Sequence, residues 1–241
     1  MNYALIFAGG VGSRMNTKAR PKQFLEIHGK PIIIHTIEYF EEHSEIDAIC
    51  IVIVEEWLEY TKKLLEKYNI KKVNWIVKGG KSAIESQYIG LNSIRMSKDY
   101  SEDDIVLIHD GVRPLINNKV ITDCINGVKK YGTAVTVAPA IETIIQTNEV
   151  NTITKTFPRS KCKLARAPQS FRIGEILNVH IKAKSENIYD FVDSVSMMLY
   201  YGYKIHTVEG PAENIKVTNP ADFYICRALL DARENSQIYG V

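Results

Sequence analysis

Short apolar runs alternate with amphipathic segments along most of the chain. The first run, Tyr3 to Ala8, has no charged position and predicts a strand that is buried on both faces. Further apolar runs predict strands over 47–54, 73–78, 104–109 and 133–139. Apolar residues at helical spacing predict helices over 31–40, 57–68 and 117–131. Strands that alternate with helices indicate an α/β fold, with a mostly parallel sheet and helices on both faces.

The segment from Ile141 to Arg166 interrupts this alternation. It is rich in Thr, Ile and Lys and has no helical period, so we expect extended strands that project from the body. A projecting strand exposes an unpaired edge unless another chain covers it, and this arm therefore predicts a homodimer. An ordinary edge hairpin is the alternative. Beyond the arm, the pattern predicts helices over 173–185 and 191–201, a strand over 203–208, and a last helix starting at Asn219-Pro220.

Length, charge and cysteine usage narrow the class of protein. The 241 residues are enough for one large α/β domain. Thirty basic and 28 acidic residues nearly cancel, which argues against the basic surface of a nucleic-acid-binding protein. No apolar run reaches the length of a membrane span and no signal-peptide pattern opens the chain, so we expect a cytoplasmic protein without membrane insertion. The four cysteines include no C-x-x-C pair, which predicts reduced thiols and no zinc site.

A glycine-rich segment directly follows the first strand. Its glycines are Gly9, Gly10 and Gly12. Glycine lets backbone N–H groups approach an anion because no Cβ stands in the way. Arg14 and Lys22 place positive charge close by, so the segment predicts a phosphate-binding loop, with a tight strand-to-helix turn as the alternative. The dinucleotide fingerprint G-x-G-x-x-G fails at Met15, which disfavours a hydride-transfer enzyme.

Charged residues also stand near the ends of other predicted strands. In an open α/β sheet the ligand lies beyond the carboxyl ends of the strands. Asp110 follows a buried strand, and its carboxylate beside a phosphate-binding loop suits Mg²⁺; a turn or cap residue is the alternative. Arg113 either binds a ligand or pairs with Asp110. Lys216 lies between two apolar residues of a short expected strand, where it either neutralises phosphate or stays a solvated lysine.

Five motifs occur in order between Ala8 and Asp222. They read A-G-G-x-G-x-R-M, P-K-Q-F-L-x-x-x-G-K-P, H-D-x-x-R-P, P-Q-x-F and N-I-K-V-T-x-P-x-D. The ordered set resembles the CTP-dependent cytidylyltransferases that act on methylerythritol 4-phosphate or ribitol 5-phosphate. This resemblance implies a single Rossmann-like domain over 1–241 and a homodimer joined through the arm at 141–166. It also implies a Mg²⁺-dependent transfer from CTP to a polyol phosphate.

The resemblance further implies a role for each motif residue. The nucleotide-binding residues would be Ala8, Gly9, Gly10, Gly12, Gly80, Lys81 and Ser86. The catalytic cations at the triphosphate would be Arg14, Lys22 and Lys216. Asp110 would lie beside both the metal and the acceptor, and Arg113 would contact the acceptor. Arg159, in the arm, would bind the acceptor's phosphate across the dimer interface.

The chain departs from the family pattern at three positions near these ligands. Ala167 replaces the threonine of T-P-Q, Ala83 stands where an arginine is usual, and Glu142 replaces the aspartate of D-T. Gly9 and Val112 favour the ribitol branch, so we expect D-ribitol 5-phosphate as the acceptor, with methylerythritol 4-phosphate as the alternative. A sugar-phosphate nucleotidyltransferase would share the first loop but would not explain N-I-K-V-T or the arm. A binding module would take CTP without releasing pyrophosphate.

Overall fold

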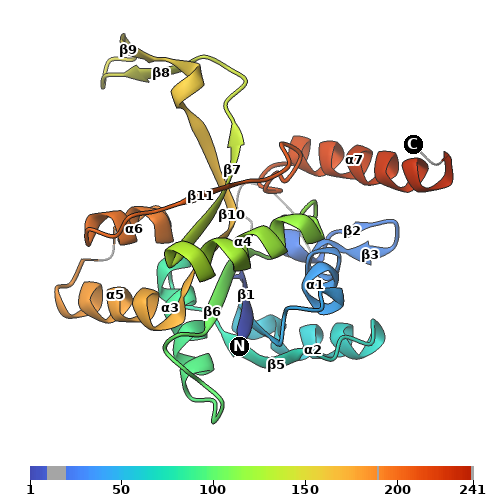
Figure 1. Cartoon of the computed structure of the whole chain (residues 1–241). Helices are drawn as coiled ribbons and strands as arrows, with labels where there is room; N and C mark the ends of the chain where they lie inside the picture. The colour runs from blue at the N-terminus through green and yellow to red at the C-terminus, as the bar shows by residue number, and fades with distance from the viewer. Residues whose placement is uncertain (10–19, 189, 240–241) are drawn as a thin grey trace.

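The computed structural model describes residues 1–9, 20–188 and 190–239, the last four of these by their backbone alone (Figure 1). Within them, a seven-stranded sheet has the spatial order β11-β7-β10-β6-β1-β4-β5. Its strands are β1 (Asn2–Ala8), β4 (Ala48–Ile53), β5 (Val73–Lys78), β6 (Ile105–Asp110), β7 (Thr133–Pro139), β10 (Lys163–Arg172) and β11 (Thr207–Glu209). All neighbours are parallel except β10, which runs antiparallel to β6 and β7. The predicted mostly parallel sheet is therefore confirmed.

Helices cover both faces of this sheet. They are α1 (Ile32–Glu42), α2 (Leu58–Lys67), α3 (Ala83–Arg95), α4 (Asn118–Tyr131), α5 (Ile173–Ser185), α6 (Ser194–Tyr200) and α7 (Pro220–Tyr239). Successive residues of a strand point to opposite faces. In β1, Ala4 and Ile6 pack with α1, α2 and α4, whereas Tyr3 and Leu5 pack with α3, α5 and α6. Both faces of β1 are buried, which explains its uninterrupted apolar run. None of the described helices is long and apolar enough to cross a membrane.

Two small hairpins complete the described structure. The first joins β2 (Glu26–Ile27) to β3 (Lys30–Pro31). The second joins β8 (Ile144–Thr147) to β9 (Ile153–Phe157) and stands well away from the body, carried by the outer ends of β7 and β10 (Figure 1). Ile145 and Ile153 on this hairpin are exposed. Extended strands therefore project from the body over 144–157, and the assignment of 141–166 as a dimerisation arm stays a prediction.

Three of the expected elements are much shorter in the structure than the sequence predicts, or do not form. The helix expected over 191–201 begins only at Ser194, because Asp193 accepts a hydrogen bond from Ser196 N and closes a capping box. The strand expected over 203–208 is limited to Thr207–Glu209, where it pairs with β7. The short strand expected around Lys216 does not form; this segment has no regular secondary structure and pairs with no strand of the described chain.

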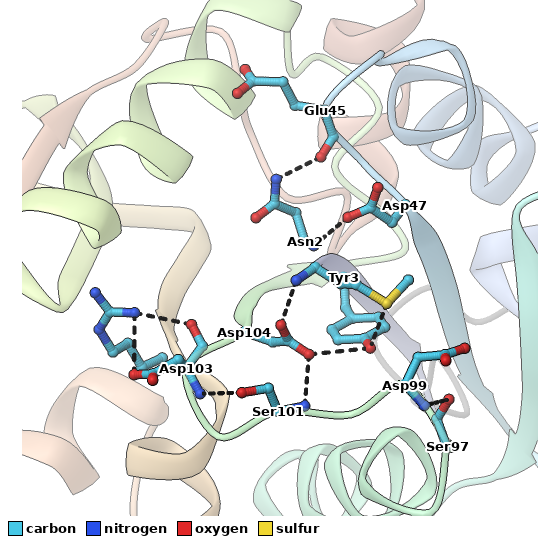
Figure 2. A network of polar contacts seen from close by, with 11 residues as sticks. Asn2, Tyr3, Glu45, Asp47, Ser97, Asp99, Ser101, Asp103 and Asp104 are labelled. Atoms are coloured by element: carbon cyan, nitrogen blue, oxygen red, sulfur yellow. Dashed lines mark hydrogen bonds and ion pairs between the residues drawn. The ribbon is translucent and has the colours of Figure 1, made fainter.

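A polar network holds the amino end of β1, which is the end of the strand opposite the site described below (Figure 2). The carboxylate of Asp104 accepts hydrogen bonds from Ser101 N at 2.9 Å and Tyr3 Oη at 3.4 Å. Asn2 N donates to Asp47 Oδ2 at 2.6 Å. These bonds tie β1 to the segments that lead into β6 and β4. They hold the three central strands in the register that brings their carboxyl ends together.

Helix α3 was not expected from the sequence, and Gly90 sets its distance from the sheet. A Cβ at Gly90 would lie 2.8 Å from both Leu5 Cδ1 and Val52 Cγ2. We expect Gly90→Ala to lower the free energy of unfolding by roughly 1–3 kcal/mol, because overpacking outweighs the gain in helix propensity. Urea unfolding checks this, with Asn92→Ala in the same helix as the control. If Gly90→Ala is as stable as the wild type, the close packing is refuted.

Candidate active site

The site lies where the order of the sheet changes direction. From β1 the chain proceeds to β4 and β5 on one side and then returns to β6 on the other. Such a switch point opens a crevice beyond the carboxyl ends of the strands. Phe7 and Asp110 are partners in the β1–β6 register, so the last residues of both strands reach the rim together. A cavity of about 410 Å³ occupies this position.

The cavity is bordered by all of the predicted nucleotide-binding residues that the structure describes. These are Ala8, Gly9, Gly80, Lys81 and Ser86. Lys22, Asp110 and Lys216 line the same cavity. The fold therefore brings together residues from widely separated motifs, as predicted. Their roles toward a ligand remain predictions, and Gly10, Gly12 and Arg14 lie outside the described residues.

Gly9 and Gly79 both lie close to the hydroxyl of Ser86. A Cβ at Gly9 would lie 3.3 Å from Ser86 Oγ, and one at Gly79 would lie 3.1 Å from it. Ser86 Oγ accepts a hydrogen bond from Gly80 N at 3.1 Å and donates to Ser82 O at 2.8 Å. Ser82 in turn caps α3, because its Oγ accepts from the backbone N–H at position 85. A side chain at Gly9 or Gly79 would therefore crowd the Ser86 hydroxyl near the start of α3.

Gln23, which the sequence analysis did not single out, positions Lys22. Gln23 is buried, and its Nε2 donates to Ala8 O at 2.8 Å. This bond ties the 3₁₀ turn η2 (Lys22–Phe24) to the end of β1. Phe24 anchors the other side of the turn, with its ring centroid 4.9 Å from that of Trp57. The P-K-Q-F sequence was the available signal, because a buried amide must find a hydrogen-bond partner.

A buried carboxylate between two cations forms the floor of the cavity. Asp110 Oδ2 is 2.7 Å from Arg113 Nε, and Asp110 Oδ1 is 2.5 Å from Lys216 Nζ. Burial would raise the pKa of Asp110, but the charges of Arg113 and Lys216 outweigh it and lower the pKa to about 2. Asp110 is therefore ionised at neutral pH. The sequence left open whether Arg113 pairs with Asp110, and the structure forms that pair.

Arg113 is also held from two other directions. Its Nη1 donates to Asn214 O at 3.0 Å. Its own carbonyl oxygen is 3.2 Å from His109 Nε2. Burial lowers the pKa of His109 to about 4, although the Asp110 carboxylate acts in the opposite direction, so the imidazole is neutral at pH 7. A neutral ring that donates from Nε2 supports the Arg113 backbone and carries no charge into the site.

Asp110 is the carboxylate that fits the predicted Mg²⁺. No group of three or more His, Cys, Asp or Glu side chains able to hold a metal occurs in the described ranges. Mg²⁺ is commonly held by one or two carboxylates, with phosphate oxygens and water filling its other positions. One ionised carboxylate at the wall of a cavity that glycines and lysines also line suits that type of site. The residues present therefore fit a metal that arrives with its nucleotide.

A second cavity of about 200 Å³ adjoins the first. Phe7, Ala83, Asp110 and Lys216 border both cavities. The second is also lined by Arg113, Arg166, Ala167 and Gln169. Two connected cavities with shared charged residues suit a donor and an acceptor that react at their junction.

The predicted acceptor-binding residues Arg113 and Arg159 lie in different places. Arg113 borders the second cavity, whereas Arg159 lies in the arm, at the 3₁₀ turn η4 (Arg159–Lys161), and borders neither cavity of its own chain. Its Nη1 donates to Ile141 O at 3.0 Å. The predicted contact of Arg159 with an acceptor would accordingly have to come from another subunit, as the resemblance implies.

The fold and the rim together define an α/β protein with a charged crevice at the carboxyl ends of its strands. A family model for 2-C-methyl-D-erythritol 4-phosphate cytidylyltransferase (IspD) matches residues 3–232. The chain belongs to this family of cytidylyltransferases, which confirms the resemblance seen in its motifs.

Individual relatives match the chain over nearly its whole length. A ribitol-5-phosphate cytidylyltransferase of Streptococcus agalactiae is 49% identical over 241 residues, and one of Vibrio parahaemolyticus is 46% identical over 240 residues; each comparison covers 100% of both chains. The crystal structure of 4-diphosphocytidyl-2C-methyl-D-erythritol synthase from Anaerococcus prevotii superposes with a TM-score of 0.81 at 25% identity. It covers 95% of this chain and 96% of that one.

Proposed function

We propose that this protein is a D-ribitol 5-phosphate cytidylyltransferase, which transfers CMP from CTP to D-ribitol 5-phosphate and releases pyrophosphate. The observation that carries the proposal is the identity of 46% and 49% over the full length with two relatives of that name. Methylerythritol 4-phosphate is the second candidate acceptor, because the family model and the superposed structure bear that name.

In this proposal the larger cavity holds CTP and the smaller one holds the acceptor. An oxygen of the acceptor's phosphate attacks the α-phosphorus of CTP, a new P–O bond forms, and the bond to pyrophosphate breaks. A phosphate dianion is already a competent nucleophile, so no general base is required. The protein lowers the barrier by holding two anionic reactants in line and by neutralising charge as the transition state forms.

Cations at the junction of the cavities supply that neutralisation. Lys22 lies on the 3₁₀ turn η2, which the hydrogen bond from Gln23 to Ala8 O ties to the end of β1. Lys216 forms an ion pair with Asp110. Lys216 borders both cavities, so it is placed to contact a phosphate on either side. Arg14 completes the proposed set. This arrangement resembles other phosphoryl-transfer sites, in which positioning and electrostatic stabilisation supply most of the rate enhancement.

Mg²⁺ is the proposed cofactor, with Asp110 as its protein ligand. When bound, Mg²⁺ neutralises charge on the phosphate oxygens. Lys216 and Arg113 keep Asp110 ionised before the nucleotide arrives. An ionised carboxylate is the form that accepts a hard cation.

The proposal extends to the whole chain. We treat residues 1–241 as one nucleotidyltransferase domain with the arm at 141–166 as its dimer contact, through which Arg159 reaches the acceptor of the partner subunit. The exposed Ile145 and Ile153 of the arm would be covered in such a dimer. A cytoplasmic location agrees with four cysteines that are all free thiols.

The proposed function is tested by pyrophosphate release from CTP in the presence of Mg²⁺. We expect release with D-ribitol 5-phosphate and little with methylerythritol 4-phosphate, each compared with a reaction that lacks an acceptor. Release with methylerythritol 4-phosphate alone would favour the second candidate. If CTP binds in a calorimetric titration and neither acceptor causes release, both candidates are wrong.

A further inference from the structure

The second cavity contains a positive charge that the proposed mechanism has not used. Arg166 borders this cavity, and its Nε is buried without a hydrogen-bond partner in the described chain. The guanidinium makes no ion pair with any described residue. Burial lowers the pKa of Arg166, and the nearby charge of Arg113 adds to this effect. An arginine stays charged in proteins, so a cation faces the cavity with no counter-charge of its own.

An irregularity in β10 brings Arg166 to the cavity. The register between β10 and β7 shifts between Ala165 and Gln169. In a regular strand, successive side chains face opposite sides, but a bulge re-aims them. Here Ala165, Arg166 and Ala167 all border the same cavity. The backbone is fixed there, because Ala167 O accepts from Asn214 Nδ2 at 2.7 Å.

The carboxylates of the cavity are already engaged elsewhere. Asp110 pairs with Arg113 and Lys216. Asp193 accepts from Ser196 N at 2.8 Å and from Gln169 Nε2 at 2.9 Å. Neither acid neutralises Arg166, although both border the cavity. The cavity therefore has an excess of positive charge, and a ligand with anionic oxygens would satisfy it.

We propose that Arg166 binds the phosphate group of the acceptor and takes the place of the hydroxyl that Ala167 lacks. This assignment rests on the cytidyl transfer proposed above. A guanidinium presents several N–H donors in a planar fork, which matches the oxygens of a phosphate monoester. Lys216 lies at the junction of the two cavities, so a phosphate between Arg166 and Lys216 would face the α-phosphorus of CTP.

The test compares Arg166→Gln and Arg166→Lys with Arg172→Gln, an arginine of the same strand that borders neither cavity. We expect Arg166→Gln to raise the KM for D-ribitol 5-phosphate by about tenfold or more, the loss typical of one charged hydrogen bond. Arg166→Lys should recover part of this loss because it keeps the charge. The KM for CTP and the urea midpoint should stay unchanged in both variants. An unchanged acceptor KM, or an equal rise in both KM values, would overturn the assignment.

Inorganic phosphate separates this proposal from the proposed function. We expect phosphate to compete with the acceptor, and Arg166→Gln to weaken that inhibition. If the acceptor KM rises but phosphate inhibits both proteins equally, Arg166 does not bind the phosphate group. If the wild type is inactive with D-ribitol 5-phosphate, the proposed function fails. A calorimetric titration of phosphate into the wild type and into Arg166→Gln then still tests the role of Arg166. Weaker phosphate binding by the variant supports the assignment, and equal binding overturns it.

Discussion

Lys216→Ala lowers turnover by about 100- to 1,000-fold with an unchanged fold, the loss expected when one preorganised charge-stabilising contact is removed. Lys216 borders both cavities and its Nζ pairs with Asp110 Oδ1. In the proposed reaction this ammonium neutralises charge that builds up as the acceptor attacks. Its side chain is 40% exposed and Asp110 keeps its pair with Arg113, so its loss should lower the free energy of unfolding by no more than about 1 kcal/mol.

Steady-state pyrophosphate release and urea unfolding together check this expectation. Lys119→Ala is the matched control, since Lys119 is an exposed lysine that pairs with Asp123 on α4 and borders neither cavity. The control should keep wild-type turnover. Wild-type turnover in Lys216→Ala would remove Lys216 from the mechanism. A large loss of stability would instead show that the Asp110–Lys216 pair is a structural bond.

Asp110→Asn should impair both stability and activity. The carboxylate is buried between Arg113 and Lys216, and its loss leaves the buried guanidinium without a counter-charge. Breaking a buried ion pair from one side typically costs roughly 3–5 kcal/mol. We also expect pyrophosphate release to fall sharply and to need more Mg²⁺, because the proposed protein ligand of the metal is gone.

Unfolding at several pH values separates the stability effect from the catalytic one. The pKa of Asp110 falls from 3.8 to about 2 on folding, so the wild type has this stabilisation above pH 3.8 and loses it as pH falls toward 2. The free energy of unfolding of Asp110→Asn should lack the part of the pH dependence that comes from this carboxylate. Asp123→Asn, at an exposed pair on α4, should cost less than about 1 kcal/mol. A variant with wild-type stability and an unchanged Mg²⁺ requirement would contradict both roles of Asp110.

The strands and helices with clean apolar patterns were predictable from the sequence. The expected bounds of β5, β7 and α5 agree with the structure to the residue, since Gly79 follows β5, Gly132 precedes β7 and Glu186 follows α5. Helix α3 was missed because Gly90 and several polar residues weaken its periodicity. A signal was present, however, in Ser82 followed three positions later by Glu85, which is a typical helix start.

The charged residues of the site were easier to predict than the residues that support them. Lys22, Asp110 and Lys216 were found because charge beside glycine and strand ends has a chemical meaning before any fold is known. Gln23 and Asn214 were missed as supporting residues, since each acts through a backbone carbonyl that is distant in the sequence. Their acceptors are 15 and 47 residues away, so the motifs mark these two residues but do not reveal which carbonyl each one contacts.

The segment that carries Lys216 joins a site whose other parts come from earlier in the chain. Val217 N donates to Val112 O at 2.9 Å, and Asn214 O accepts from Arg113 across 101 residues of sequence. During synthesis the amino-terminal strands leave the ribosome first and begin to fold, but the last cation of the crevice is still untranslated. A nascent chain of this protein would therefore reach a nearly complete sheet before it acquires the last of the charged residues that line the described crevice.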